Sequence, residues 1–342
     1  MSSRPKETIL YGIELHSPRQ PISNDSSSLK SNTSHKSSKT EKKSRFFTFA
    51  LPTLIVTIII GLIVIHTRFD VIDAAPPKAS EAETTRQNLA EHTSRLIKET
   101  EILNKDHSAF SHAKSTIQSW QEYLGDVWIP WPNAEDIPSG QTNPPVHTDA
   151  QSSITTEEFI KDLSLYTTQA CNAAEKATTA QQKQTLLTIA FDSLYLTHNL
   201  ASSLNITSPQ STYAITTVGK TLQNSQVLKS INKDRQFLER DYALNNEKYK
   251  DNLEDIHLLH SLEEAILRNN VSDTRIAVAQ FPRATKQTLT EAAIIDTIRE
   301  TIKAASLGNN SAEEYRHLIF FLYHLTENSA INDAINFFNA SA

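Results

Sequence analysis

Two Glu-x-x-His pairs are the residues in this sequence whose types and spacing could support chemistry. They are Glu254 with His257 and Glu314 with His317. Residues three apart lie on one face of a helix, and two such helices can hold a pair of metal ions if two further helices supply glutamates. The same spacing arises by chance in a chain with 12 histidines, and it also fits solvated helix faces. We therefore expect no resident metal or cofactor, and keep these four side chains as the metal candidates.

Sequence motifs of the common enzyme classes are missing from the chain. It has no His-Glu-x-x-His, no Gly-x-Ser-x-Gly, no Cys-x-x-Cys and no phosphate-binding glycine loop. Only 6 glycines occur, which disfavours loop-built active sites and tight β-hairpins. The single cysteine, Cys171, leaves no internal disulfide. Because alanines surround it we expect a buried apolar thiol, with an intermolecular disulfide as the alternative. We expect a protein that is not an enzyme.

The uncharged, apolar run 46–66 must be placed before the rest of the chain can be interpreted. A helix needs about 20 such residues to cross a bilayer. A cleaved signal peptide has a shorter apolar core close to the N-terminus, whereas this run starts after 45 residues, and Ile72-Asp73-Ala74-Ala75 fits a cleavage site poorly. We therefore predict an uncleaved signal-anchor with one transmembrane helix over 46–66.

Basic residues predict the orientation of this anchor. Six Lys or Arg residues lie in the 20 positions before the run and three lie in the 20 positions after it. The more basic flank stays in the cytoplasm. Residues 1–45, rich in Ser and Lys, should therefore form a disordered cytoplasmic tail. Residues 67–342 should be periplasmic or otherwise extracytoplasmic, as in a single-pass membrane protein.

A helix with heptad spacing should follow the proline-containing spacer 67–79. Over 80–125 an apolar residue recurs every seventh position. These positions are Leu89, Leu96, Leu103, Phe110, Ile117 and Leu124. The position three residues later is mostly polar, as at His92 and Glu99, so a coiled coil formed here would be weak. We predict a stalk helix that either pairs with a second copy through 80–124 or packs back on its own domain.

Residues 126–150 should form an irregular connector, because five prolines fall within 126–149. The connector also contains Trp128 and Trp131. Exposed tryptophans are efficient contact residues, so these two could form a platform for a sugar or a peptide. Alternatively, they plug the connector onto the neighbouring core.

The remaining residues, 151–342, are expected to form an all-α domain. Capping boxes at Thr155–Glu158 and Ser311–Glu314 predict two helix starts. The pattern predicts helices over about 155–180, 181–204, 212–270 with breaks near Asn232 and Asn245, 272–281, 289–307, 312–326 and 329–339. Whether these stack as a short α-solenoid or an irregular bundle stays open. The net charge of −11 over 67–342 argues against nucleic acid as a partner.

The stretch 269–302 resembles the C-terminal region of mitofilin-type inner-membrane proteins. The shared pattern is a short helix closed at Phe281-Pro282, followed by a longer helix with Ile294, Ile295 and Ile298. The order of tail, anchor, heptad helix and helical domain is also similar. The resemblance covers about a tenth of the chain, which differs in its short stalk and in about 40 further residues after Ile302. It implies a scaffold that shapes or tethers membranes, with no catalytic residues to carry over.

Two functions are compatible with these features. The first is a non-enzymatic, membrane-anchored scaffold or protein-interaction protein, whose partners are the lipid bilayer, other envelope or membrane proteins and, if 80–124 pairs, a second copy. The second is an extracytoplasmic sensor or ligand- or metal-binding helical domain that works through a partner, because the short tail holds no signalling domain.

Overall fold

The computed structural model describes residues 79–104, 109–127, 129–131, 133, 135, 137, 140–148, 153–280 and 289–327. In these residues it contains nine α-helices and no strand, which confirms the predicted all-α class. None of these helices combines the length and the hydropathy needed to cross a bilayer. The predicted tail, the predicted membrane span and the predicted helix 329–339 lie outside the described residues.

The predicted stalk is two helices, α2 (Glu81–Leu103) and α3 (Ala109–Leu124), that pack against each other. Ser80 caps α2 by accepting a hydrogen bond from the Glu83 backbone N–H, and α2 ends at the cap residue Asn104. Residues 105–108 lie outside the described residues, and α3 packs back against α2 instead of continuing it. The prediction of one helix over 80–125 is therefore wrong.

The heptad residues form the inner face of this hairpin. All six are at most 6 % exposed, and they pack into the core that α2 and α3 share with the next two helices. Their seven-residue spacing reflects a buried stripe that continues from one helix to the next. Of the two alternatives, packing back on the domain is the one observed within the described residues.

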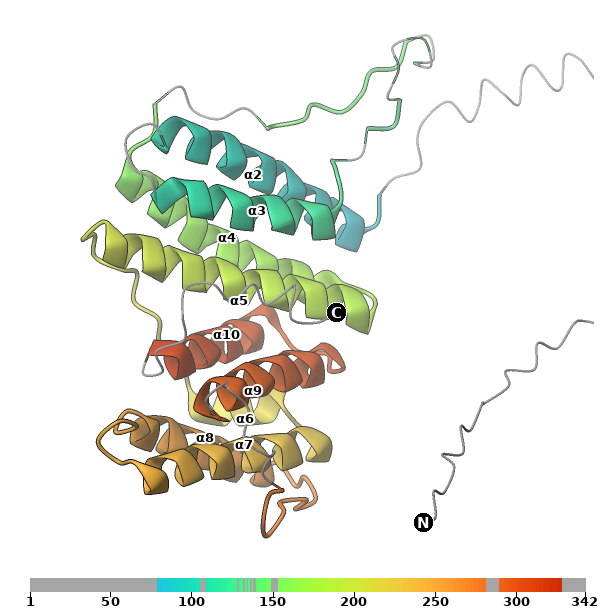
Figure 1. Ribbon diagram of the computed structural model, residues 1–342. Coiled ribbons are helices and arrows are strands. Elements are labelled where there is room, and N and C mark those ends of the chain that lie inside the picture. Colours follow the sequence, from blue (N-terminus) through green and yellow to red (C-terminus); the bar gives the residue numbers. More distant parts are fainter. Residues whose placement is uncertain are drawn as a thin grey trace, which may run out of the picture. The chain divides into compact units, whose positions relative to one another are not determined.

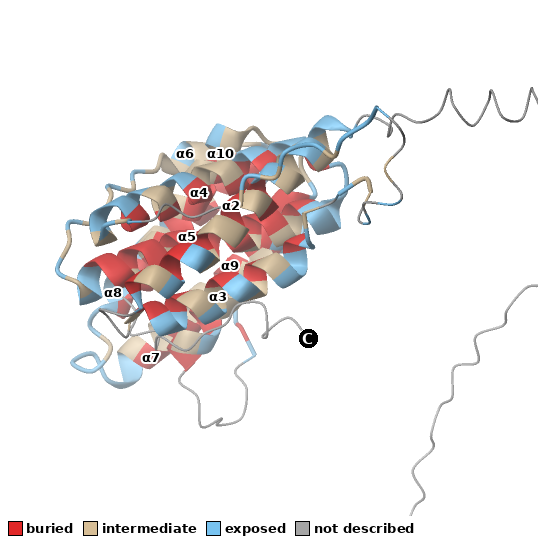
Figure 2. Cartoon of the chain, turned by 90° about the horizontal axis from the view of Figure 1, so that it is seen from above, coloured by how far each residue is buried: buried red, intermediate tan, exposed pale blue. Residues whose placement is uncertain are grey.

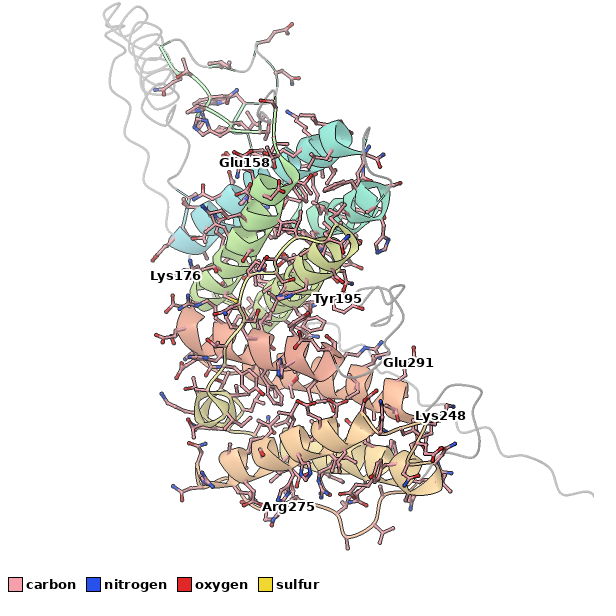
Figure 3. The ribbon with its side chains drawn as sticks, turned by 90° about the vertical axis from the view of Figure 1, so that its left-hand side faces the viewer. Glu158, Lys176, Tyr195, Lys248, Arg275 and Glu291 are labelled. Atoms are coloured by element: carbon pink, nitrogen blue, oxygen red, sulfur yellow. The ribbon has the colours of Figure 1, made fainter. Side chains whose placement is uncertain are left out.

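The second layer is formed by α4 (Thr156–Lys176) and α5 (Ala180–Ser203). The predicted capping box is present: the Glu158 backbone N–H donates to Thr155 Oγ1 at 3.2 Å, and the Thr155 N–H donates to Glu158 Oε2 at 2.9 Å. Helix α2 packs on α4, and α3 packs on α5. Glu158 and Lys176 mark the two ends of α4 in Figure 3.

The next helices are α6 (Ile215–Thr221), α7 (Ser225–Leu244) and α8 (Asn252–Leu267). The predicted break near Asn245 is confirmed. The predicted break at Asn232 is wrong, because this residue is 3 % exposed inside α7 and its side-chain oxygen accepts a hydrogen bond from the Ile276 backbone N–H.

Residues 271–280 run along α7 without forming the predicted helix 272–281. Two amide side chains of α7, Asn232 and Gln236, form hydrogen bonds with backbone groups of this segment. Gln236 Nε2 donates to the Ile276 carbonyl at 2.9 Å, and the Ala279 N–H donates to Gln236 Oε1 at 2.8 Å. The third bond is the one that Asn232 accepts from the Ile276 N–H. These bonds replace the ones that a helix would make internally.

The last pair, α9 (Leu289–Ser306) and α10 (Ala312–Glu327), lies between earlier parts of the chain. Helix α9 packs on α5 and α7, and α10 packs on α4, α5 and α6. In Figure 1 this red pair separates the light green α4 and α5 from the yellow-orange α6, α7 and α8. Units of a solenoid contact only their sequence neighbours, so this order is that of an irregular stack. Buried residues line the facing sides of the helices (Figure 2).

Candidate functional site

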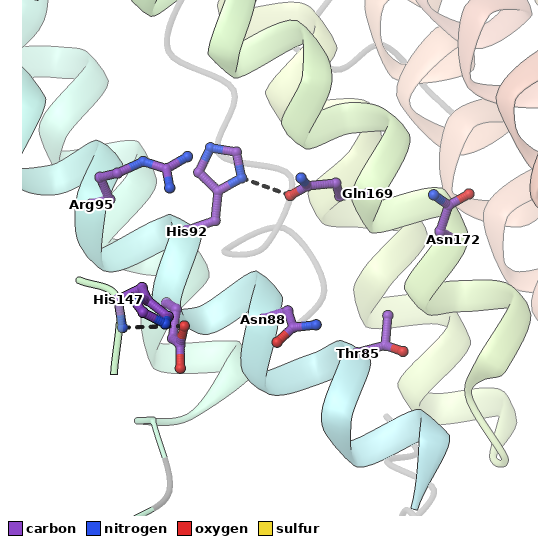
Figure 4. A pocket seen from close by; sticks show the side chains of 8 residues that line it. Thr85, Asn88, His92, Arg95, His147, Gln169 and Asn172 are labelled. Carbon is purple, nitrogen blue, oxygen red and sulfur yellow. Dashed lines mark hydrogen bonds between the residues drawn. The ribbon is translucent and has the colours of Figure 1, made fainter. Parts of the chain in front are cut away.

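A polar pocket of about 260 Å³ opens between α2 and α4. Its α2 residues are spaced three or four apart, which places them on one helix face. The side chains that line it are Thr85, Asn88, Glu91, His92, Arg95, His147, Gln169 and Asn172. Figure 4 shows them around the hollow, with His147 contributed by the connector. The His147 backbone N–H donates to Glu91 Oε2 at 3.3 Å, which holds the connector against α2.

His92 lies at the inner wall of this pocket and is only 4 % exposed. Its Nδ1 is 2.6 Å from Gln169 Oε1, and its Nε2 is 2.9 Å from Asp162 Oδ2. A protonated ring satisfies both oxygens as donors, and a neutral ring satisfies both sites if the Gln169 amide presents its NH₂ group. The ring also meets Tyr166 edge-on at 5.2 Å. His92 is therefore held from three sides by α4.

Arg95 joins two carboxylates below His92. Its Nη2 donates to Asp162 Oδ2 at 3.0 Å, and its Nε lies 3.6 Å from Glu99 Oε1. Burial, with repulsion from Asp162, raises the pKa of Glu99 to about 7. Burial acts in the same direction on Asp162, but its hydrogen bonds from His92 and Arg95 outweigh burial and lower its pKa. Asp162 thus stays charged, while Glu99 binds a proton near neutral pH.

Glu99 is 1 % exposed and its Oε2 has no hydrogen-bond partner among the described residues. A buried, unpaired carboxylate oxygen costs free energy in the charged form. The proton that the raised pKa favours reduces that cost. The pocket can supply hydrogen-bond donors and acceptors to a small polar ligand. Glu99, which pairs with the pocket residue Arg95 but does not itself line the pocket, can change charge near neutral pH.

A second chain of polar contacts continues from α2 to the other helices. Thr93 Oγ1 lies 2.6 Å from the Tyr166 hydroxyl, and the Tyr166 ring stacks on Trp120 with 5.3 Å between centroids. Trp120 Nε1 in turn donates to Asp192 on α5 at 2.7 Å. These contacts tie four helices together and use the polar atoms of buried aromatic residues.

The predicted metal residues have structural or solvated positions. Glu254 and His257 are exposed on α8, beside a shallow hollow of about 410 Å³. Glu314 caps α10 and pairs with Lys220 at 2.7 Å, and His317 Nδ1 accepts a hydrogen bond from the Ala214 N–H at 3.2 Å. Within the described ranges, no group of three His, Cys, Asp or Glu side chains could hold a metal ion.

The predicted interaction residues divide into three groups. The six heptad residues belong to the core, so they offer no surface to a second copy. Trp131 is half-buried, and the Asn143 amide bonds both its backbone N–H and its carbonyl, at 3.0 and 2.8 Å. Trp128 lies outside the described residues.

Cys171 is the predicted buried thiol, and burial raises its pKa to about 12, which makes it unreactive.

Sequence reasoning did not find the α2–α4 pocket. It noted His92 and Glu99 only as polar residues at the second heptad position. The partners of His92, Asp162 and Gln169, lie 70 and 77 residues later in the chain, and no local pattern links them. The one available signal was a pair of polar residues seven apart on an otherwise apolar helix face.

Comparisons with protein-family models, curated proteins and solved structures give no match to this chain. The resemblance of 269–302 to mitofilin-type proteins therefore stays a prediction.

Proposed function

We propose that this protein is a single-pass membrane scaffold, not an enzyme, whose extracytoplasmic helical domain binds other membrane or envelope proteins. The observation that carries the proposal is the short distance along the chain between the predicted anchor and α2, the first helix that the structure describes. Twelve residues, 67–78, separate the uncharged run 46–66 from Ala79. Fully extended, they reach at most about 45 Å. The helical domain is therefore tethered close to the membrane surface.

The use made of reactive side chains supports a scaffold over a catalyst. His92 is fixed by Asp162 and Gln169, and His317 and Glu314 support backbone or helix-cap positions. Side chains in such bonds hold helices and helix caps in place, which fits a structural use of these residues. The resemblance of 269–302 to mitofilin-type proteins would imply the same class of function, although residues 271–280 do not form the short helix of that pattern.

Photo-crosslinking of the full-length chain in intact cells tests this proposal. A photoreactive residue is placed at large apolar side chains that are at least half exposed, namely Leu165, Leu244 and Leu307. Matched controls carry it at exposed polar positions on the same or a neighbouring helix, namely Lys161, Lys229 and Glu313. We expect the apolar positions to capture one recurrent set of membrane or envelope proteins. Absence of captured protein at every position, together with substrate turnover by the purified chain, contradicts the scaffold.

A ligand-binding sensor is the second candidate, favoured by the α2–α4 pocket with its amides, guanidinium and imidazole. We expect a true ligand of this pocket to raise the unfolding temperature of the full chain and to lose this effect in Asn88→Ala and Asn172→Ala. Both side chains are exposed at the rim, so their loss leaves the fold intact. For a metal ligand, stoichiometric metal lost on Glu254→Ala or His317→Ala decides for the second candidate.

A further inference from the structure

The N-terminal end of α2 meets the C-terminal ends of α3 and α4. Arg86 Nη1 donates to the Leu124 carbonyl at 2.5 Å, and Lys176 Nζ lies 3.0 Å from Glu81. The chain that comes from the predicted anchor enters the domain at this end. We call residues 79–86, 123–131 and 173–186 the entry end, within the limits of the described residues.

The entry end carries apolar and aromatic side chains open to solvent. Tyr123 is 48 % exposed and Ile129 is 40 % exposed, and Trp131 is half-buried beside them in the sequence. A hollow of about 310 Å³ opens here as well, lined in part by Tyr123, Leu124 and Leu186. Tyrosine and tryptophan combine an apolar ring with a polar atom, a combination that favours the interface between lipid and water.

We propose that the entry end lies on the bilayer, with Tyr123, Ile129 and Trp131 in the interfacial layer of the membrane that holds 46–66. This inference rests on the proposed membrane anchor. The tether of twelve residues keeps the entry end, more than any other part of the domain, within about 45 Å of the lipid. The contact adds a second point of attachment and fixes the orientation of the helical stack relative to the membrane.

The charge of the entry end defines the kind of lipid that fits. Five acidic residues lie on or next to it against three basic residues, Arg86, Lys176 and Lys183. The acidic residues are Glu81, Glu83, Glu122, Asp126 and Glu175. Such a surface is repelled by anionic headgroups. The contact is therefore an aromatic and aliphatic one to zwitterionic lipid, and we expect anionic lipid to weaken it.

Tryptophan quenching in proteoliposomes of the full chain tests the contact. The vesicles are phosphatidylcholine with bromine on the acyl chains, which quenches tryptophans at the membrane. Trp120 is 0 % exposed in the core and serves as an internal reference. We expect partial quenching of the wild-type emission. The double variant Trp128→Phe/Trp131→Phe, which retains only Trp120, should show none.

A charge variant then locates the contact. Tyr123→Asp/Ile129→Asp should reduce the quenched fraction at least two-fold. The matched control Leu165→Asp/Leu307→Asp changes two exposed apolar residues elsewhere and should leave the quenched fraction unchanged. Unfolding temperatures of both variants confirm that each is folded. Exchange of half the lipid for phosphatidylglycerol with the same brominated acyl chains keeps the quencher density constant and should lower the quenched fraction of the wild-type chain.

Flotation of the same vesicles after carbonate extraction separates the two proposals. A chain that floats but shows no quenching has an anchor and holds its domain away from the lipid, which overturns the contact alone. A chain that does not float overturns the anchor and the contact together. Equal quenching in the charge variant and in its control also overturns the assignment of the membrane contact to the entry end.

Discussion

Trp120 Nε1 donates a hydrogen bond of 2.7 Å to Oδ2 of Asp192, and both side chains are almost fully buried. This bond joins α3 to α5. It gives the buried carboxylate one strong donor, while burial raises the pKa of Asp192 to about 6. At higher pH the protein therefore holds a buried charge for which the Trp120 indole N–H is the donor found among the described residues.

Removal of that donor should destabilise the protein most at alkaline pH. We expect Trp120→Phe to lower the free energy of unfolding by about 1–3 kcal/mol for the unpaired carboxylate, in addition to the lost packing. The loss should be larger at pH 8 than at pH 5. Asp192→Asn, which keeps an acceptor oxygen and carries no charge, should be at least as stable as the wild type at pH 8. Denaturant titration at the two pH values checks this, and a pH-independent loss contradicts it.

Three buried carboxyls predict that the protein is more stable in mild acid than at pH 8. Burial raises the pKa of Asp234 and Glu99 to about 7 and that of Asp192 to about 6. A folded-state pKa above the unfolded value means that the folded chain binds more protons between pH 4 and 7, so stability falls as pH rises through that range. Each tenfold difference in proton affinity between the folded and unfolded chain corresponds to about 1.4 kcal/mol.

The measurement for this pH dependence is the unfolding temperature of the full chain from pH 4.5 to 8.5. Glu99→Gln should flatten the fall, because the amide cannot ionise. Glu313→Gln, at an exposed residue of α10, is the matched control and should leave the slope unchanged. A stability that rises with pH would falsify the assignment of these groups.

Gly219→Ala should destabilise the protein although alanine is the better helix former. A Cβ at position 219 would lie 2.6 Å from the backbone carbon and the Cβ of Ala265, so α6 and α8 would have to move apart. In an open helix the same change stabilises by about 0.5–1 kcal/mol. Whether Gly219→Ala raises or lowers the stability of the protein therefore tests the close approach of α6 and α8. Thr216→Ala, exposed on α6, is the control. Equal or higher stability of Gly219→Ala in thermal unfolding contradicts the close approach.

Leu96→Ala and Ile117→Ala distinguish a core role from a coiled coil. Both residues are 0 % exposed between helices of one chain. We expect each variant to lose about 2–5 kcal/mol of unfolding free energy without a change in molar mass. Leu165→Ala, at an exposed leucine, should lose far less. Sedimentation of the full chain in detergent gives the molar mass. If either core substitution dissociates a dimer, that result supports pairing of two copies through 80–124.

Local signals in the sequence predicted much of the helical domain. The starts of α4 and α10 follow from the Thr155 and Ser311 capping boxes, whose partners lie three residues away. The predictions failed where contacts between residues far apart in the sequence determine the secondary structure. Asn232 sits inside α7 because a segment 44 residues later uses its side chain. Residues 80–125 fold into a hairpin because α4 and α5 offer a surface for the apolar stripe.

The candidate site was beyond the reach of these local signals. His92 becomes part of a pocket only through Asp162 and Gln169 on another helix. Its own neighbours on α2 reveal a polar residue within an apolar stripe and nothing about its partners. Pairing across helices is a property of the folded chain.

The order of the layers has a consequence for synthesis of the chain. Helices α9 and α10 fill the middle of the stack, between α4–α5 and α6–α8, yet they are made last. At roughly 5–20 residues per second, two apolar faces stay uncovered for several seconds after α8 has emerged. A nascent chain of this kind needs protection by chaperones until α9 and α10 have been made. A chain cut before Leu289 keeps both faces open and becomes a target for proteolysis.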